Sequence, residues 1–252
     1  MGADMRTARL AKRLLAARLR AAMFAAITLL ALNPGVGRAN QEVAHCHTAL
    51  LLAVDVSSSV DAEEYDLQVQ GLAAALRDPE VRQAILAAEQ SGVWLAVVYW
   101  SGWAHQEIRL PWTPLFDEAA VENAANAIAR LERRYFDFPT AIGRALHFIE
   151  SQWPPQTRDC ARRVIDVSGD GVNNDGEGPV RLRNRLVAQG FTLNGLVIRG
   201  AQPDPEEHYR NELIGGPGAF VEIAQNYADY PRAIRRKLLR ELRPAVSTRS
   251  PR

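Results

Sequence analysis

Short, continuously apolar runs alternate along this chain with longer stretches in which apolar residues recur every three or four positions. Uninterrupted apolar runs are typical of strands that helices cover on both faces, as in a parallel sheet. We therefore predict an α/β fold with an open, mostly parallel, doubly wound sheet. The predicted strands lie at residues 49–54, 93–100, 106–110, 164–167, 191–198 and 219–223.

Local signals add an edge strand and the helix starts. The run at 106–110 follows the run at 93–100 too closely for a helical crossover, so we expect it to pair antiparallel at the edge. Asp61 and Glu64 are predicted to form a capping box ahead of one helix, and Asp117 is predicted to cap another. Further helices are predicted to begin near residues 140, 179 and 231, within one domain at 45–243 that precedes a flexible tail at 244–252.

Residues 1–39 follow a different pattern. They contain seven basic residues and one acidic residue, an uncharged apolar run at 21–32, and small residues up to Ala39. This order predicts a secretory signal peptide that is cleaved after Ala39. The apolar run has 12 residues, whereas a membrane-spanning helix needs about 20. We therefore expect an exported protein, periplasmic or secreted, with no stable membrane span after cleavage.

Charge and cysteine content narrow the function classes. The whole chain has a formal net charge of +1, but after residue 39 there are 23 of its 30 basic and 28 of its 29 acidic residues. A surface without a basic excess is a poor match for nucleic acid, so we expect no nucleic-acid partner. The two cysteines, Cys46 and Cys160, lie in the exported part, where an oxidising compartment would let them pair.

The first candidate site follows the most apolar strand. Asp55, Ser57 and Ser59 form an Asp-x-Ser-x-Ser sequence between that strand and a helix. In an open parallel sheet, ligands bind beyond the carboxyl ends of the strands. A carboxylate and two hydroxyls are hard oxygen ligands of the kind that Mg²⁺ prefers. The alternative interpretation is a Ser-rich turn in which Asp55 and a serine only cap the helix.

Two later segments offer more oxygen ligands. Asp170 lies in a Gly-flanked loop directly after the predicted strand at 164–167, and Thr140 precedes a predicted helix. Taken singly, Thr140 is an ordinary helix cap and Asp170 an ordinary turn residue. Together with the Asp55 loop, and in this order along the chain, the two residues favour a shared binding site over separate local roles.

The chain resembles the von Willebrand factor type A (vWA) domain over essentially its whole mature length. That family carries a metal-ion-dependent adhesion site formed by an Asp-x-Ser-x-Ser loop, a distant Thr and a later Asp. The chain is also similar to an exported bacterial family of such domains that is classed as having no known function. This narrower resemblance rests on the phrases LAVDVSSSVDAEEY, LRDPEV, VYWSG, TAIGRAL, RRVIDVSGDGVNNDG, LNGLVI, IGGPGAFVE and AIRRKL.

The resemblance implies a strand order of 3-2-1-4-5-6 and a divalent cation, Mg²⁺ or Mn²⁺, at the top of the sheet. The implied metal ligands are Asp55, Ser57, Ser59, Thr140 and Asp170. It also makes the strands after Cys46 and Cys160 neighbours, and we therefore expect a disulfide between these cysteines at the bottom of the sheet.

The chain departs from the family pattern at two places. Phe138 and Pro139 precede Thr140 where many such domains have two glycines, which would stiffen this loop. Asp175, in an extension of the Asp170 loop, is a rival metal ligand.

Two further residues call for an interpretation. Asp166 lies inside an apolar strand, so its carboxylate needs a partner, and Arg162 or Arg163 is the candidate. Trp103, beyond the turn after the strand at 93–100, is a possible anchor for a partner at the site rim, although it could equally fold back over the core.

The resemblance implies a non-enzymatic, cation-dependent module that binds an acidic group of a partner protein through the metal. One alternative is a hydrolase or phosphoryl-transfer enzyme in which Asp55 or a serine is the nucleophile. The sequence has neither a Gly-x-Ser-x-Gly nor a Gly-x-x-x-x-Gly-Lys-[Ser/Thr] motif to favour it. The other alternative is a metal-independent scaffold of the cell envelope.

Overall fold

The computed structural model describes residues 46–87 and 92–242. The predicted signal peptide at 1–39 and the tail at 244–252 lie outside these residues. No helix in the described part of the chain is long and apolar enough to cross a membrane.

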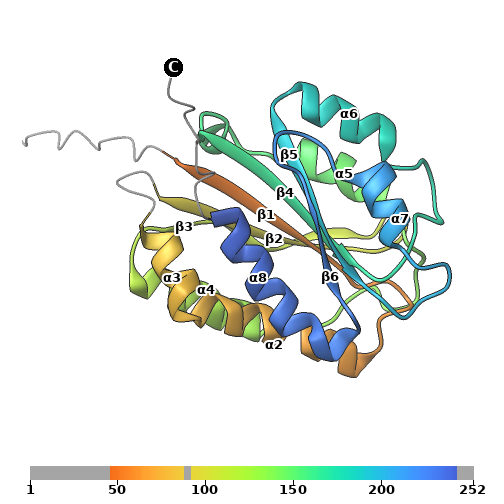
Figure 1. Ribbon diagram of the computed structural model, residues 1–252, viewed down its shortest axis with the longest axis horizontal. Helices are drawn as coiled ribbons and strands as arrows, with labels where there is room; N and C mark the ends of the chain where they lie inside the picture. The colour runs from red at the N-terminus through yellow and green to blue at the C-terminus, as the bar shows by residue number, and fades with distance from the viewer. Residues whose placement is uncertain (1–45, 88–91, 243–252) are drawn as a thin grey trace, which may run out of the picture. The chain divides into compact units, whose positions relative to one another are not determined.

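A single sheet organises the described residues (Figure 1). Its order is β3-β2-β1-β4-β5-β6, and all neighbours pair in parallel except β2 and β3, which are antiparallel. Both the predicted α/β class and the predicted strand order are confirmed. The strands are β1 (Thr48–Asp55), β2 (Val93–Trp100), β3 (Gln106–Leu115), β4 (Arg162–Gly169), β5 (Phe191–Ile198) and β6 (Val221–Ala224).

Helices cover both faces of this sheet (Figure 1). One face packs against α2 (Ala62–Arg77), α3 (Pro79–Leu86), α4 (Glu118–Ala129) and α8 (Tyr230–Leu242). The other packs against α5 (Ile142–Ser151), α6 (Val180–Ala188) and the helical turns that include α7 (Glu206–His208) and Tyr209–Leu213. Short 3-10 turns lie at Pro155–Thr157 and Tyr227–Asp229.

Strand β1 shows why the apolar runs are uninterrupted. Leu50 and Leu52 belong to the core beneath α2 and α8, whereas Leu51 and Ala53 belong to the core beneath α5 and α6. Because side chains alternate between the faces of a strand, burial on both faces requires an apolar residue at every position. The strand ends at Asp55, which is the first polar residue after this apolar run.

Local signals start the helices, including one that we did not predict. Asp61 and Glu64 form the predicted capping box of α2, and the Asp117 carboxylate accepts the Ala120 N–H at the start of α4. Asp78 caps α3, the helix that the periodicity did not reveal, with Pro79 in its first turn. Strand β3 is also longer than expected, because an edge strand tolerates prolines such as those at 111 and 114.

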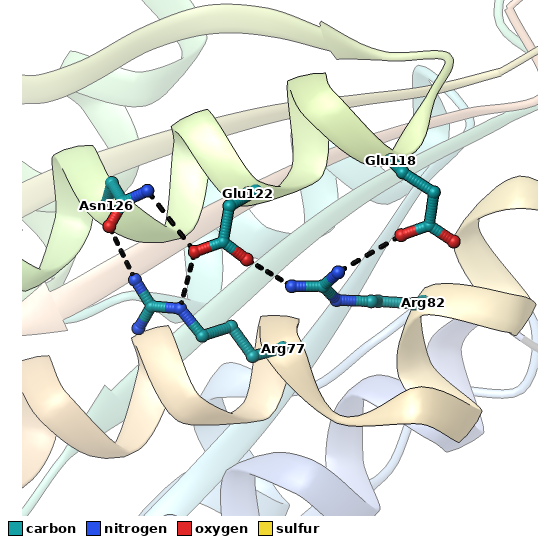
Figure 2. Close-up of polar contacts among 5 residues, drawn as sticks. All are labelled: Arg77, Arg82, Glu118, Glu122 and Asn126. Atoms are coloured by element: carbon teal, nitrogen blue, oxygen red, sulfur yellow. Dashed lines mark hydrogen bonds and ion pairs between the residues drawn. The ribbon is translucent and has the colours of Figure 1, made fainter.

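Arginines of α2 and α3 connect these helices to α4 (Figure 2). The Arg77 Nε donates to Glu122 Oε1 at 2.9 Å and its Nη2 donates to Asn126 Oδ1 at 2.8 Å. Arg82 bridges Glu122 and Glu118, the second at 3.1 Å. These ion pairs are partly exposed, so each adds little to stability, but together they link α2 and α3 to α4.

The predicted disulfide is present between Cys46 and Cys160, whose Cα atoms are 4.4 Å apart. These cysteines lie just before β1 and β4, which are parallel neighbours. The bridge therefore lies at the amino ends of the central strands, opposite the edge that carries Asp55.

The expected partner of Asp166 was wrong. Its carboxylate forms a 2.9 Å ion pair with Lys237 of α8, not with Arg162 or Arg163. Lys237 is fully buried and also pairs with Glu241 at 2.9 Å. Arg162 and Arg163 instead donate to the backbone carbonyls of Glu241 and Gln189. A partner that lies far along the chain, on a helix that crosses the sheet, left no local signal near Asp166.

Candidate metal centre

Three loops bring five oxygen-bearing side chains together at the carboxyl edge of the sheet. Asp55 ends β1, and the Ser57 and Ser59 hydroxyl oxygens follow it, 3.3 Å apart. The Ser59 hydroxyl donates to Asp170 Oδ1 at 2.7 Å, which links the first loop to the loop after β4. The Thr140 hydroxyl donates to Ser57 Oγ at 3.4 Å, which adds the third loop. The five predicted site residues are thus neighbours in space.

Asp55 is the most constrained of these residues. It is fully buried, and its Oδ1 accepts the Ser57 backbone N–H at 2.8 Å. Its Oδ2 is buried without a hydrogen-bond partner among the described residues. Burial, and after it the negative charge of Asp170, raises the pKa of Asp55 to about 8. The raised pKa means that the ionised form of Asp55 is disfavoured in this arrangement.

Backbone hydrogen bonds hold the three loops in place. The Ser58 N–H donates to the Phe138 carbonyl at 2.9 Å, which ties the first loop to the segment before Thr140. The Thr140 N–H donates to Asn174 Oδ1 at 2.8 Å, and its carbonyl accepts the N–H groups of Asn174 and Asp175. Thr140 is thus fixed by the extended loop that follows Asp170.

The structure separates the alternatives for Thr140. Helix α5 begins two residues after it, and the N-cap residue Ala141 makes no side-chain capping bond. Thr140 is buried and its hydroxyl reaches Ser57, so it is not the helix cap that its position in the sequence also allowed.

The rival carboxylate, Asp175, makes a different contact from that of Asp170. Its Oδ2 accepts the Trp103 backbone N–H at 2.7 Å, which joins the Asp170 loop to the turn between β2 and β3. Asp170, and not Asp175, makes the hydrogen bond to Ser59. Trp103 is 50% exposed and is therefore not folded over the core, and its role as an anchor for a partner stays a prediction.

Tyr209 is a neighbour of the site that the sequence did not reveal. A Cβ atom at Gly169 would lie 2.7 Å from both Asp55 Oδ2 and the Tyr209 hydroxyl, so these two oxygens flank the same glycine. Tyr209 is fully buried, and its hydroxyl has no partner in the described part of the chain. Burial and the charges of nearby carboxylates raise the pKa of its phenol. It lies in the polar sequence EEHYRNEL, where no periodicity marks it as buried.

The donor set is chemically uniform. Two carboxylates and three hydroxyls supply only hard oxygen atoms, and Ser59 is exposed, so the cluster opens to solvent. No group of three or more His, Cys, Asp or Glu side chains suited to a metal ion is found among the residues described. The two carboxylates and three hydroxyls fit a hydrated Mg²⁺ or Mn²⁺ ion, which needs few protein ligands, better than a fully caged Zn²⁺ ion.

Solved structures share this fold at low sequence identity. Proximal thread matrix protein 1 from the mussel byssus, with a zinc occupied MIDAS motif, is 17% identical, with a TM-score of 0.57 over 79% of this chain and 48% of that one. A von Willebrand factor type A structure from Catenulispora acidiphila is 17% identical, with a TM-score of 0.55 over 78% of this chain and 43% of that one. The pilus adhesin SpaC from Lactobacillus rhamnosus GG is 11% identical, with a TM-score of 0.57 over 78% of this chain and 30% of that one.

This chain spans less than half the length of each of these three structures. Their likeness establishes a vWA-like fold, which agrees with the strand order and the antiparallel edge strand. None of the curated proteins matches the chain. A family model described as a protein of unknown function (DUF1194) matches residues 45–246, and the chain therefore belongs to the DUF1194 family.

Proposed function

We propose that this protein is an exported, adhesion-type binding module that uses a divalent cation, Mg²⁺ or Mn²⁺, to hold an acidic group of a partner protein. The proposed metal ligands are the side chains described above, acting directly or through water: Asp55, Ser57, Ser59, Thr140 and Asp170. The proposed role is binding and not catalysis.

The observation that carries the proposal is the convergence of these side chains from loops far apart in the sequence. Ser59 and Asp170, 111 positions apart, share a 2.7 Å hydrogen bond, and Thr140 contacts Ser57 across 83 positions. A Ser-rich turn that only capped a helix would not require this convergence, because a helix cap needs only one loop.

The unpartnered carboxyl oxygen of Asp55 supports a cation in particular. A buried carboxylate oxygen without a partner, beside a second carboxylate, costs stability unless a positive charge neutralises it. A divalent ion, when bound, would supply that charge and a Lewis-acidic position to which a partner carboxylate could coordinate.

Two of the structural neighbours favour the same function. The mussel matrix protein has a zinc occupied MIDAS motif, and SpaC is a pilus adhesin. Similarity of fold does not transfer function by itself, so these neighbours support the proposal only together with the site.

Export is supported by the disulfide. A bridge between Cys46 and Cys160 persists in oxidising compartments and is rare in the cytosol. This agrees with the basic and apolar segments that predict a signal peptide at residues 1–39.

Affinity capture from cell-envelope extract tests the proposal. The mature protein and its Asp55→Ala variant would be immobilised and exposed to the extract with Mg²⁺ or with a chelator. We expect a partner that the parent retains with Mg²⁺ but releases to chelator, and that the variant does not retain. Identical captured proteins in all four arms would contradict metal-dependent binding and favour a metal-independent scaffold.

A further inference from the structure

A small pocket opens beside the proposed metal centre, between the first turns of α5 and α6. Its volume is about 180 Å³, and Trp103 and Gly143 form part of its wall. Most of its ionisable side chains are basic: the pocket is lined by Arg144, His147, Arg181 and Arg185, with Glu177 as the acidic exception.

Arg144 is held in this pocket without an acidic partner. Its guanidinium lies over the Trp103 ring, 3.9 Å from the ring centroid, and its Nε donates to the Trp103 carbonyl at 3.3 Å. These contacts fix the direction of the side chain. Its terminal nitrogens, Nη1 and Nη2, have no hydrogen-bond partner among residues 46–87 and 92–242. The cation is therefore oriented and available.

The other arginines of the pocket are already neutralised. Arg181 pairs with Glu177 at 2.7 Å, and Arg185 pairs with Glu150. The net positive charge of the pocket therefore comes from Arg144. It stands out against a mature chain in which acidic residues outnumber basic ones, 28 to 23.

The position of Arg144 in its helix is unfavourable for a structural cation. It lies in the first turn of α5, where the helix dipole repels positive charge and attracts negative charge. That turn has no acidic residue, and its N-cap residue, Ala141, makes no side-chain capping bond, although Asn173 accepts the Gly143 N–H. Both the helix end and the guanidinium would therefore attract an anion into the pocket.

The pocket is close to the metal centre along the chain. Gly143, in its wall, is three residues after Thr140, so their Cα atoms are at most about 11 Å apart. The same loop serves both sites, since Asn173 Oδ1 accepts the Gly143 N–H at 3.2 Å and Asn174 Oδ1 accepts the Thr140 N–H. An extended peptide covers this distance in about three residues.

We propose that this pocket binds a second acidic side chain of the partner, with Arg144 as its cation and Trp103 as its wall. The partner segment would thus carry two carboxylates about three residues apart, one for the metal centre and one for Arg144. This inference rests on the proposed function for the first carboxylate, but the pocket's contacts are independent of the metal.

The test compares two synthetic peptides, acetyl-Asp-Gly-Gly-Asp-amide and acetyl-Asp-Gly-Gly-Asn-amide, in titrations of the ¹⁵N-labelled mature protein followed by NMR. With Mg²⁺, we expect the diacid to bind about five- to tenfold more tightly than the peptide with one Asp, as for a charge-assisted hydrogen bond at a partly exposed site. The Arg144→Gln variant should bind both peptides equally. Arg158→Gln, an exposed arginine before β4, should retain the difference.

A second arm with chelator separates the two proposals. The diacid should still shift the Arg144 Nε and Trp103 indole signals, the latter assigned with Trp103→Phe. If these signals respond but Mg²⁺ does not strengthen binding of either peptide, the pocket stands and metal-dependent binding fails. If Mg²⁺ strengthens binding but the two peptides are equal in the parent, the pocket is wrong. A preference that persists in Arg144→Gln would also overturn it.

Discussion

Asp55 and Gly169 show how closely the backbone approaches the proposed metal centre. Asp55 keeps one carboxylate oxygen without a partner among the described residues, and Gly169 leaves the space in which that oxygen and the Tyr209 hydroxyl lie. Glycine is therefore required at position 169 by the atoms around it and not by the backbone conformation, since the φ of Gly169 is not in the left-handed region. The sequence showed the glycine but not the contact that requires it.

Gly169→Ala should disturb the site more than the fold. The new Cβ would lie 2.7 Å from Asp55 Oδ2 and 3.1 Å from Asp55 Cβ, closer than carbon normally approaches either atom. We expect the free energy of unfolding to fall by about 1–3 kcal/mol, because the core must shift. We also expect weaker Mg²⁺ binding, because Asp55 must move.

Chemical denaturation and metal titration would measure these two effects. Gly178→Ala is the matched control, since the nearest atom to its new Cβ is 3.8 Å away. That variant should remain close to the parent in both measurements. Equal effects of the two substitutions would contradict the assigned role of Gly169.

The strands were the most predictable elements, and nonlocal contacts were the least. The apolar runs at 93–100 and 191–198 coincide with β2 and β5, because burial on both faces leaves a continuous signal. Helix α3 was missed because it has eight residues, too few for its two buried side chains, Val81 and Ile85, to establish a period. The Lys237 partner of Asp166 lies 71 positions away, where no local pattern connects the two.

The buried charges beneath α8 should make stability depend on pH. Burial, and then the charge of Glu241, raises the pKa of Asp166 to about 8 despite the ion pair with Lys237. The unfolded carboxyl has a pKa of about 3.9, so the folded protein retains a proton that the unfolded chain loses. The free energy of unfolding should therefore fall between about pH 4 and pH 8.

Asp166→Asn should remove this contribution. The Asn side chain cannot titrate but can still accept a hydrogen bond from Lys237, so the variant should lose less stability than the parent as the pH rises through this range. Urea denaturation of parent and variant across the range measures the difference. Parallel pH curves for parent and Asp166→Asn would refute the assignment of this pH dependence to Asp166.

Lys237→Met is expected to lower the free energy of unfolding by about 3–5 kcal/mol, because it leaves buried carboxyls without their cation.

The disulfide connects the two halves of the sheet at its amino edge. It closes a loop across a sequence separation of 114, so its loss should lower the free energy of unfolding by about 4–5 kcal/mol in the chain-entropy model. The variant with Cys46→Ser and Cys160→Ser should show this loss in guanidinium denaturation under oxidising conditions. Parent protein treated with a reductant is the control and should match it. Free thiols in the untreated parent would contradict the bridge.

At the scale of the whole molecule, the covalent link and the proposed metal centre lie at opposite ends of β1 and β4. Cys46 and Cys160 precede these strands, and Asp55 and Asp170 end or follow them. The five candidate metal ligands could be named from the sequence, because the family resemblance supplies the order in which such residues occur along the chain. Two features could be seen only in three dimensions: the contact of Asp170, and not Asp175, with Ser59, and the pocket at Arg144.

Titration calorimetry with Mg²⁺, repeated with Mn²⁺, tests the central claim that these loops form a cation site. Metal-free protein of residues 40–252 should bind one equivalent, and its Asp55→Ala variant should bind none while remaining folded, because the change removes one of two neighbouring carboxylates. Asp159→Ala removes an exposed carboxylate before β4 and should bind as the parent does. If Asp55→Ala binds Mg²⁺ as tightly as the parent, the cation is not held at this site and the Ser-rich loop is only the start of a helix.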